Sequence, residues 1–322
     1  MRNRVWMLMI AVTVALGGTG CKRETPFPNR EIEFIIPFAP GGPADTAARI
    51  IQPVMAQKLG VSIVLVNKAG AGGALGAEYI MNAPADGYRV LATTNNTLTV
   101  LPALEANLSY KMEDFTPLGS YLSDMSVIAS RPDPRWKTLD EFVAYAKKNP
   151  SKLNYGSAGN GTISYFAMEL VRLAYGLEIT HIPFQGTAPA KTALLGGHVD
   201  VTATGFGFVG SDIRSGSLIG LVTTSSKRLP EFPDIPTTAE MGFPDVALNI
   251  WTGLYLPKGA PPEIAAKLSA ALEETMKDPA VQKAVRDAGY IVDYRDAQAT
   301  AQFAASEAAM IREAVGKLGI KK

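Results

Sequence analysis

Two blocks of alternating strand and helix patterns constrain the fold of this chain more than any other feature. The first block covers residues 31–94 and the second covers residues 139–223. Short apolar strands that alternate with amphipathic helices are typical of a mostly parallel sheet flanked by helices. Apolar strands are also expected near residues 128 and 250, where the chain passes from one block to the other. We therefore predict an α/β protein of two lobes, joined by two strands and able to close over a cleft.

The same pattern predicts the extent of each lobe. We expect lobe 1 to consist of residues 29–128 and 251–322, and lobe 2 to consist of residues 129–250. Three helical patterns after residue 262 would return the chain to lobe 1. The predicted strands are Glu31–Phe38, Val61–Val66, Arg89–Thr94, Met125–Arg131, Leu153–Tyr155, Ile179–Pro183, Val199–Thr204, Leu218–Thr223 and Asn249–Leu256.

The first twenty residues have the pattern of a secretory signal peptide. Arg2 precedes the apolar run Val5–Leu16, which is shorter than the roughly 20 residues of a membrane span. Small residues then lead to Cys21, the only cysteine. Cys21 stands where bacterial lipoproteins are cleaved and acylated, so we expect residues 1–20 to be removed and the mature protein to be anchored in the periplasm through acylated Cys21. The alternative is cleavage nearby, which leaves Cys21 as a free thiol.

The charge of the chain argues against a nucleic-acid partner. The sequence has 31 Lys and Arg residues and 30 Asp and Glu residues, and removal of the signal peptide takes away Arg2 and Arg4. A net charge close to zero provides no electrostatic footprint for nucleic acid. An anionic ligand would therefore have to be held by local geometry.

The stretch IIPFAPGGPADTAARII, which begins at Ile35, leads from a strand into a helix. We call its Pro37–Gly42 segment the first turn. Its two glycines adopt backbone conformations that other residues resist, and Asp45 and Thr46 are common N-cap residues, so we expect the helix to begin at about Asp45. A helix N-terminus has unpaired N–H donors and a partial positive charge, and therefore binds anions without a lysine. The alternative is that Asp45 only caps the helix and the glycines only turn the chain.

The stretch NYGSAGNGTISYFAMEL, which begins at Asn154, repeats this arrangement in the second block. We call its Gly156–Thr162 segment the second turn. Its glycines alternate with hydroxyl and amide residues, which supply N–H and O–H donors; each hydrogen bond to a charged group contributes roughly 1.5–3 kcal/mol. Two such turns, one in each lobe, would hold a carboxylate between them. A third polar turn, Gln185–Ala188, precedes the next helix.

A different glycine cluster, in NKAGAGGALGAEYI, follows the second predicted strand. Gly70, Gly72 and Gly76 are spaced GxGxxxG, whereas the dinucleotide fingerprint is GxGxxG with an acidic residue about 20 positions further on. Nucleotide binding is the alternative here. We expect instead a tight strand-to-helix connection that borders the same cleft, and no cofactor.

Six stretches, in this order, resemble the periplasmic solute receptors of tripartite tricarboxylate transporters, of the Bordetella uptake gene type. They are PFAPGGPADTAARI, VNKAGAGGALGAEYI, ADGYRVL, YGSAGNGT, PFQGTAPAKTALLGGHVD and DIPTTAEMGFP. The resemblance covers residues 30–318. It implies a two-lobed type II periplasmic binding protein, a small carboxylate bound in the cleft, and delivery of that ligand to membrane permease subunits. We expect the receptor to be a monomer.

The resemblance also implies the ligand-binding residues. In the family, one carboxylate is bound by the PGG turn of the first lobe and the GSxG turn of the second, and the third turn faces the variable end of the ligand. The positions of this chain that match are Phe38, Ala39, Gly41, Gly42, Asp45, Thr46, Ser157, Gly159, Asn160, Gly161, Thr162, Gln185, Gly186, Thr187, Ala188 and Thr204.

Three departures from the family pattern bear on the ligand. Tyr165 stands where many members have His, and Phe184–Gln185 stands where many have Tyr followed by Lys or Arg. Ala203–Phe206 lacks the acidic or amide residue that is common there. Without a cation at position 185 a tricarboxylate is disfavoured. We expect a monocarboxylate, or a carboxylate with an apolar or aromatic tail.

Residues for catalysis are scarce. The only histidines are His181 and His198, and the sequence contains no HExxH, no GxSxG and no pair of cysteines, so we expect neither an enzyme nor a metal site. His181 alternates with apolar residues and is expected to be a strand residue. Two alternatives stay open: a ligand-binding co-sensor for a two-component system, and an enzyme that processes a carboxylate or a nucleotide.

Overall fold

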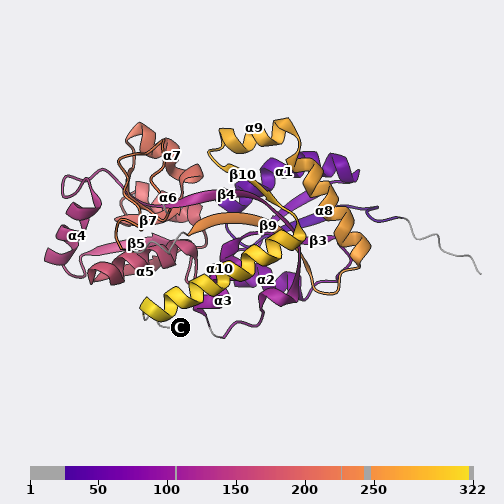
Figure 1. Ribbon diagram of the computed structural model, residues 1–322, viewed down its shortest axis with the longest axis horizontal. Helices are drawn as coiled ribbons and strands as arrows, with labels where there is room; N and C mark the ends of the chain where they lie inside the picture. The colour runs from indigo at the N-terminus through magenta and orange to yellow at the C-terminus, as the bar shows by residue number, and fades with distance from the viewer. Residues whose placement is uncertain (1–25, 106, 226, 243–247, 319–322) are drawn as a thin grey trace, which may run out of the picture.

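The structure, a computed structural model, describes residues 26–318 with the exception of residues 106, 226 and 243–247. The predicted signal peptide and Cys21 lie outside the described residues. Within the described part of the chain, no helix has the length and apolar character needed to cross a membrane. Two lobes lie side by side, and long strands pass between them (Figure 1).

A ten-stranded sheet extends through both lobes in the order β2-β1-β3-β9-β4-β7-β5-β6, and β10 and β8 also pair with β4. The strands are β1 (Ile32–Ile36), β2 (Ile63–Asn67), β3 (Arg89–Thr94), β4 (Phe115–Ser130), β5 (Leu153–Ser157), β6 (Ile179–Pro183), β7 (Val201–Gly205), β8 (Ile219–Thr223), β9 (Asn249–Pro257) and β10 (Ile291–Arg295). The helices are α1 (Pro43–Leu59), α2 (Ala74–Met81), α3 (Leu101–Leu104), α4 (Leu139–Lys148), α5 (Ile163–Tyr175), α6 (Thr187–Leu195), α7 (Phe206–Ser215), α8 (Pro262–Met276), α9 (Pro279–Asp287) and α10 (Ala297–Leu318). Three short helical turns are η1 (Ala71–Gly73), η2 (Asn96–Val100) and η3 (Met112–Asp114).

The strand β4 joins the two lobes. Its first part pairs antiparallel with β9 and β10, and its last part pairs antiparallel with β7 and β8. On one side β1 pairs in parallel with β2 and β3, and on the other β5 pairs in parallel with β6 and β7. We call the first side lobe 1 and the second side lobe 2. The structure thus combines a parallel trio in each lobe with antiparallel strands at the junction, which gives the two-lobed α/β architecture expected from the sequence.

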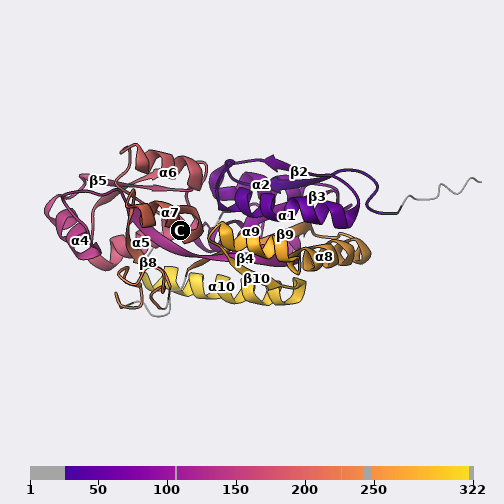
Figure 2. The same cartoon turned by 90° about the horizontal axis from the view of Figure 1, so that it is seen from above.

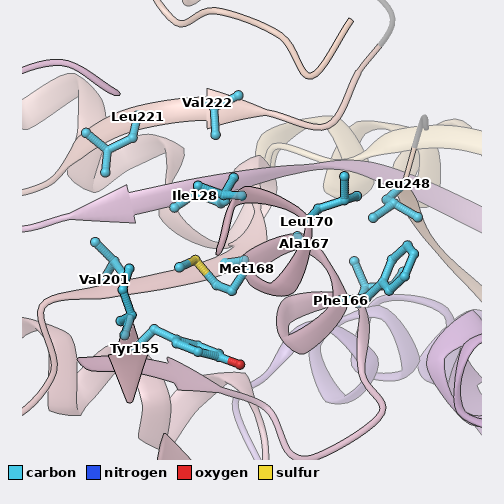
Figure 3. Packing of buried hydrophobic residues seen from close by; sticks show 14 of the residues in the cluster. Ile128, Tyr155, Phe166, Ala167, Met168, Leu170, Val201, Leu221, Val222 and Leu248 are labelled. Carbon is cyan, nitrogen blue, oxygen red and sulfur yellow. The ribbon is translucent and has the colours of Figure 1, made fainter. Parts of the chain in front are cut away.

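Each lobe has its own apolar core. In lobe 2, Tyr155, Phe166 and Leu170 are fully buried and pack with Ile128 of β4 (Figure 3). In lobe 1, the apolar faces of α1, α8 and α9 meet over the sheet. Full burial of one such side chain contributes about 1.5–3 kcal/mol. The cluster of lobe 2 also contains Val100, Ala103 and Leu104 of lobe 1, so the two cores meet at the junction.

The last helix contacts both lobes. Phe303 packs against Trp251 in lobe 1, whereas Ile311 and Val315 belong to the core cluster that contains Phe166 of lobe 2. Its 22 residues make a helix about 33 Å long, which is enough to reach across the junction. Figure 2 shows α10, in yellow, beneath both lobes. The helices α8 and α9 lie in lobe 1, whereas α10 packs against both lobes. The residue ranges given above for the two lobes stay a prediction.

A buried carboxylate lies where β4 crosses the junction. Asp124 is 2% exposed and accepts hydrogen bonds from the N–H of Gly207, near the start of α7, at 3.1 and 3.0 Å. Burial raises the pKa of Asp124 to about 8, although the N–H groups of Gly207, Met125 and Phe206 oppose this. The folded protein therefore binds a proton at Asp124 more tightly than the unfolded chain does.

We expect the free energy of unfolding to fall as the pH rises from about 4 to 8. In this range the unfolded chain has released the Asp124 proton and the folded protein retains it, so stability decreases with increasing pH. The variant Asp124→Asn keeps the shape without the titration. The free energy of unfolding is measured with urea at pH 5 and at pH 8. Between these two pH values it should fall by at least about 1 kcal/mol more in the wild type than in the variant. Equal pH dependence in both proteins would contradict the assignment.

Candidate functional site

The first turn presents the N-terminus of α1 to lobe 2. The helix begins at Pro43 with Gly42 as its N-cap, so the predicted start at Asp45 is wrong by two residues. Proline suits the first helical position because its fixed φ is helical and it has no N–H to leave unpaired. The N–H of Thr46 donates to Gly42 O (2.9 Å), while the earlier N–H groups, on Ala44 and Asp45, have no carbonyl of their own helix to bond. These donors and the helix dipole favour an anion.

Asp45 stabilises the first turn from within. Its carboxylate is 1% exposed and accepts hydrogen bonds from Gly41 N (3.0 Å), Arg49 Nε (2.7 Å) and Asn67 Nδ2 (3.1 Å). Burial raises the pKa of Asp45, but the hydrogen bonds from Arg49, Gly41 and Asn67 outweigh it and hold the pKa below its ordinary value. Arg49 neutralises a charge that would otherwise repel an anion from the helix start.

The second turn is held by its own hydroxyl groups. Thr162 is the N-cap of α5: its Oγ1 donates to Gly159 O (2.7 Å) and accepts from the N–H of Tyr165 (3.4 Å). Ser164 Oγ accepts from the N–H of Ala158 (2.8 Å). The helix begins at Ile163, as the sequence predicts, and the side chain of Thr162 caps it.

A serine–histidine contact fixes the other end of the second turn. Ser157 Oγ lies 2.7 Å from His181 Nε2 and 3.0 Å from Gly159 O. Which of Ser157 Oγ and His181 Nε2 donates in this contact is set by the tautomer of the histidine. Burial holds the pKa of His181 below its ordinary value, against the opposing effect of Glu169. Ser157 is fully buried and His181 is half-buried in this arrangement of the lobes, and the contact between them shapes the second turn.

Glycines allow the two lobes to approach closely beside these turns. A Cβ atom at Gly161 would lie 2.2 Å from Leu101 Cδ1 of lobe 1. Likewise, a Cβ at Gly72 would lie 2.3 Å from Asn160 O of lobe 2. The glycine cluster of lobe 1 is therefore a strand-to-helix connection that touches the second turn, as predicted.

Two hydrogen bonds join the lobes at this place. The N–H of Ala39 donates to Gln185 O (3.0 Å), which links the first turn to the third. The N–H of Ile163, at the start of α5, donates to Asn96 Oδ1 (2.6 Å) of η2. The structure therefore has the lobes in contact on both sides of the second turn.

A cavity lies between the lobes at these contacts. Its volume is about 20 Å³, which is sufficient for about one water molecule. None of the described residues that line it is charged. They are Phe38, Gly42, Pro43, Ala44, Thr94, Asn96, Ala158, Thr187 and Ile250.

A much larger groove, of about 730 Å³, lies on lobe 2 between the start of α4, the end of α7 and β8. Its walls include both cations and carboxylates, such as Arg228 and Glu240, which pair with one another. The start of α4 lines this groove with Leu139 and Asp140, but no second helix start lines it among the described residues. The convergence of the turns, not the volume, favours the cavity between the lobes as the functional site.

The family model "Tripartite tricarboxylate transporter family receptor" matches residues 47–320. The chain belongs to this receptor family. It is 31% identical to the protein BugT of Bordetella pertussis over 97% of this chain and 98% of that protein. The structure of the periplasmic binding protein BugD aligns with a TM-score of 0.86 at 32% identity, over 92% of this chain and 100% of BugD. MatC of Rhodopseudomonas palustris, solved with bound malate, aligns with a TM-score of 0.85 at 34% identity, over 90% and 100%. The two-lobed periplasmic receptor fold is thus shared with proteins of this family.

The residues predicted for ligand binding in this receptor fall into three groups. Phe38, Gly42 and Thr187 line the cavity. Several others shape the turns or join the lobes through their backbone or hydroxyl groups; these are Ala39, Gly41, Asp45, Thr46, Ser157, Gly159, Thr162, Gln185 and Gly186. The remaining ones are Asn160 and Gly161, which touch lobe 1, Ala188, which lies against Gly41 and Gly42, and Thr204, whose buried hydroxyl has no hydrogen-bond partner among the described residues.

Sequence reasoning missed part of the receptor's cavity wall. Thr94 ends β3, and its buried hydroxyl lacks a partner within the described residues. Asn96 follows in η2, and Ile250 comes from β9. The ends of parallel strands meet at one edge of a sheet, so the polar run after Arg89–Thr94 was the available signal for Thr94 and Asn96. Nothing in the local sequence around Ile250 indicates the cavity.

Proposed function

We propose that this protein is an extracytoplasmic receptor that binds a small carboxylate between its lobes and delivers it to the permease subunits of a tripartite transporter. The observation that supports this is the meeting of the α1 N-terminus with Ala158 of the second turn and Thr187 of α6 at one uncharged cavity. Unpaired N–H groups and the positive end of a helix bind a carboxylate without a cationic side chain.

We further propose that the ligand has a single carboxylate and an apolar tail. The polar side chains of the cavity, on Thr94, Asn96 and Thr187, are neutral, and the other contacts include Phe38 and Ile250. A second or third carboxylate would be buried against these side chains with no cation beside it. Its burial would be costly because the charge would lose its hydration without gaining an ionic partner. The malate bound in the related MatC supports a carboxylate as the ligand of this protein. It does not support a particular number of carboxylates.

Binding is expected to require opening of the lobes. The present cavity is far smaller than the roughly 300–1,000 Å³ of a ligand pocket. The contacts that would part are the hydrogen bonds of Ala39 with Gln185 and of Ile163 with Asn96. We propose that the ligand enters an open form and that the lobes then close over it.

A thermal-shift screen tests this function. We expect aliphatic or aromatic monocarboxylates to raise the melting temperature as their concentration exceeds the Kd, and citrate to leave it unchanged. Mass spectrometry of the released ligand should show it unaltered, as for a receptor and not an enzyme. A citrate Kd of about 1 μM by calorimetry would contradict the proposed ligand class.

For the intact protein we propose export, cleavage before Cys21, acylation of Cys21 and function as a monomer at the periplasmic face of the membrane. An apolar signal followed by cysteine supports this order of events. Radiolabelled palmitate should be incorporated by the wild type and not by Cys21→Ser.

A further inference from the structure

The site description leaves unused a buried, hydrogen-bonded carboxylate, that of Glu307 in α10. It is 7% exposed, and both its oxygens accept from Trp251 Nε1 at 3.1 Å. Oε1 also accepts from Asn95 Nδ2 (2.8 Å), and Oε2 accepts from Thr99 Oγ1 (2.6 Å). A buried carboxylate of this kind is stable only when its oxygens are fully hydrogen-bonded.

Two of the three donors, Asn95 and Thr99, belong to one segment of the chain. Asn95 immediately precedes η2, a π-helical turn, and Thr99 lies within it. Turns of this type depart from the regular i→i−4 hydrogen bonds of an α-helix and are frequent at functional sites. From the C-terminal helix, Glu307 accepts hydrogen bonds from the residue before this turn and from a residue near its end.

The other side of η2 faces the ligand cavity. Asn96, its first residue, lines the cavity and accepts the N–H of Ile163 from lobe 2. Asn95 is in turn bonded to β9, through Asn249 O (2.9 Å) and the N–H of Trp251 (3.3 Å). A continuous set of hydrogen bonds thus connects α10, the junction strand β9, the turn η2 and the start of α5.

We propose that Glu307 is a positioning residue for the ligand site: it holds η2 so that Asn96 meets both the ligand and the start of α5. The expected effect on ligand affinity rests on the proposed function. The expected effect on the contact between the lobes does not. Without the acceptor at 307, η2 is free to shift, Asn96 loses its alignment with Ile163, and closure over a carboxylate becomes less favourable.

The test uses Glu307→Leu, which is similar in volume and has no acceptor, and Glu307→Gln, which retains one. Burial raises the pKa of Glu307 to about 7, against the hydrogen bonds from Thr99, Asn95 and Trp251, so measurements are made at pH 8.5. With the best acid from the screen, we expect Glu307→Leu to raise the Kd about tenfold, equivalent to about 1.4 kcal/mol. Glu307→Gln should restore most of the affinity.

Hydrogen exchange in the ligand-free protein gives a second readout. The amide of Ile163 does not contact Glu307, yet Glu307→Leu should accelerate its exchange. The control is Thr275→Val, which removes a fully buried hydroxyl that donates to Ala271 O (2.7 Å) in α8, away from η2. This control should lower the melting temperature while leaving the Kd and the Ile163 exchange unchanged. A residue with a purely structural role would behave like Thr275.

The outcomes are separable. If Glu307→Leu does not fold, Thr99→Val removes one donor from η2 and should produce the same two effects, severalfold in size. Unchanged Kd and unchanged Ile163 exchange in a folded variant would overturn the inference. If the wild type binds no acid, the proposed function fails, and the exchange experiment alone decides the role of Glu307.

Discussion

Leucine at position 42 is expected to abolish carboxylate binding while both lobes stay folded. Gly42 has ordinary extended angles (φ −85°, ψ 178°), and a Cβ there would meet its nearest atoms at 3.8–3.9 Å. The backbone therefore accepts a side chain, but the rest of a leucine would project into the 20 Å³ cavity at the start of α1. We expect an affinity loss of about 100-fold or more. Loss of a good N-cap costs only about 1 kcal/mol of stability.

The matched control is Gly316→Leu. Gly316 lies in α10, and a Cβ atom there would meet no atom within 4 Å outside its own turn of helix, so the same change adds a side chain to open space. Its affinity, measured by calorimetry with the acid found in the screen, should equal that of the wild type. Full affinity in Gly42→Leu would place the ligand elsewhere.

Removal of the Asp45 carboxylate is expected to destabilise the protein and the first turn. In Asp45→Ala the side chains of Arg49 and Asn67 and the N–H of Gly41 lose their shared acceptor. Hydrogen bonds to a charged group contribute roughly 1.5–3 kcal/mol. We expect a loss of about 2 kcal/mol, because Arg49 is 57% exposed and can be hydrated in the variant. The turn would no longer be fixed, so ligand affinity should also fall. Urea unfolding and calorimetry measure the two effects.

An exposed ion pair with the same spacing is the control for this variant. Glu273 and Lys277 form an i, i+4 pair on α8 at 2.6 Å, as Asp45 and Arg49 do on α1, but both side chains are largely exposed. Glu273→Ala should cost about 0.5 kcal/mol or less. Equal losses in the free energy of unfolding would contradict the claim that the buried carboxylate of Asp45 contributes more than an exposed one.

The local features of the site could be predicted from sequence. The glycine-rich turns, the strands before them and the helix Ile163–Tyr175 follow from patterns within about 20 residues, because turn and capping chemistry is local. The start of α1 was misplaced because Asp45 is a common N-cap type. Its actual role depends on Asn67, which is 22 residues away and cannot be assigned from the local pattern.

Features that depend on distant contacts were not predicted. The helix α7 contains Gly207 and Gly210, which disfavour a helix, but Asp124 of β4 bonds to its first turn. The segment β10 is short and is a strand only because β4 lies beside it. The run NNTLT has the composition of a loop, and its form as η2 depends on Glu307, 208 residues after Thr99.

A crystal structure of the protein with the acid identified in the screen tests the central claim most directly. We expect the carboxylate oxygens within hydrogen-bond distance of N–H groups at the start of α1 and of donors from lobe 2 at the second or third turn. A carboxylate bonded instead to a lysine or arginine side chain, or an acid bound in the groove beside β8, would contradict the account.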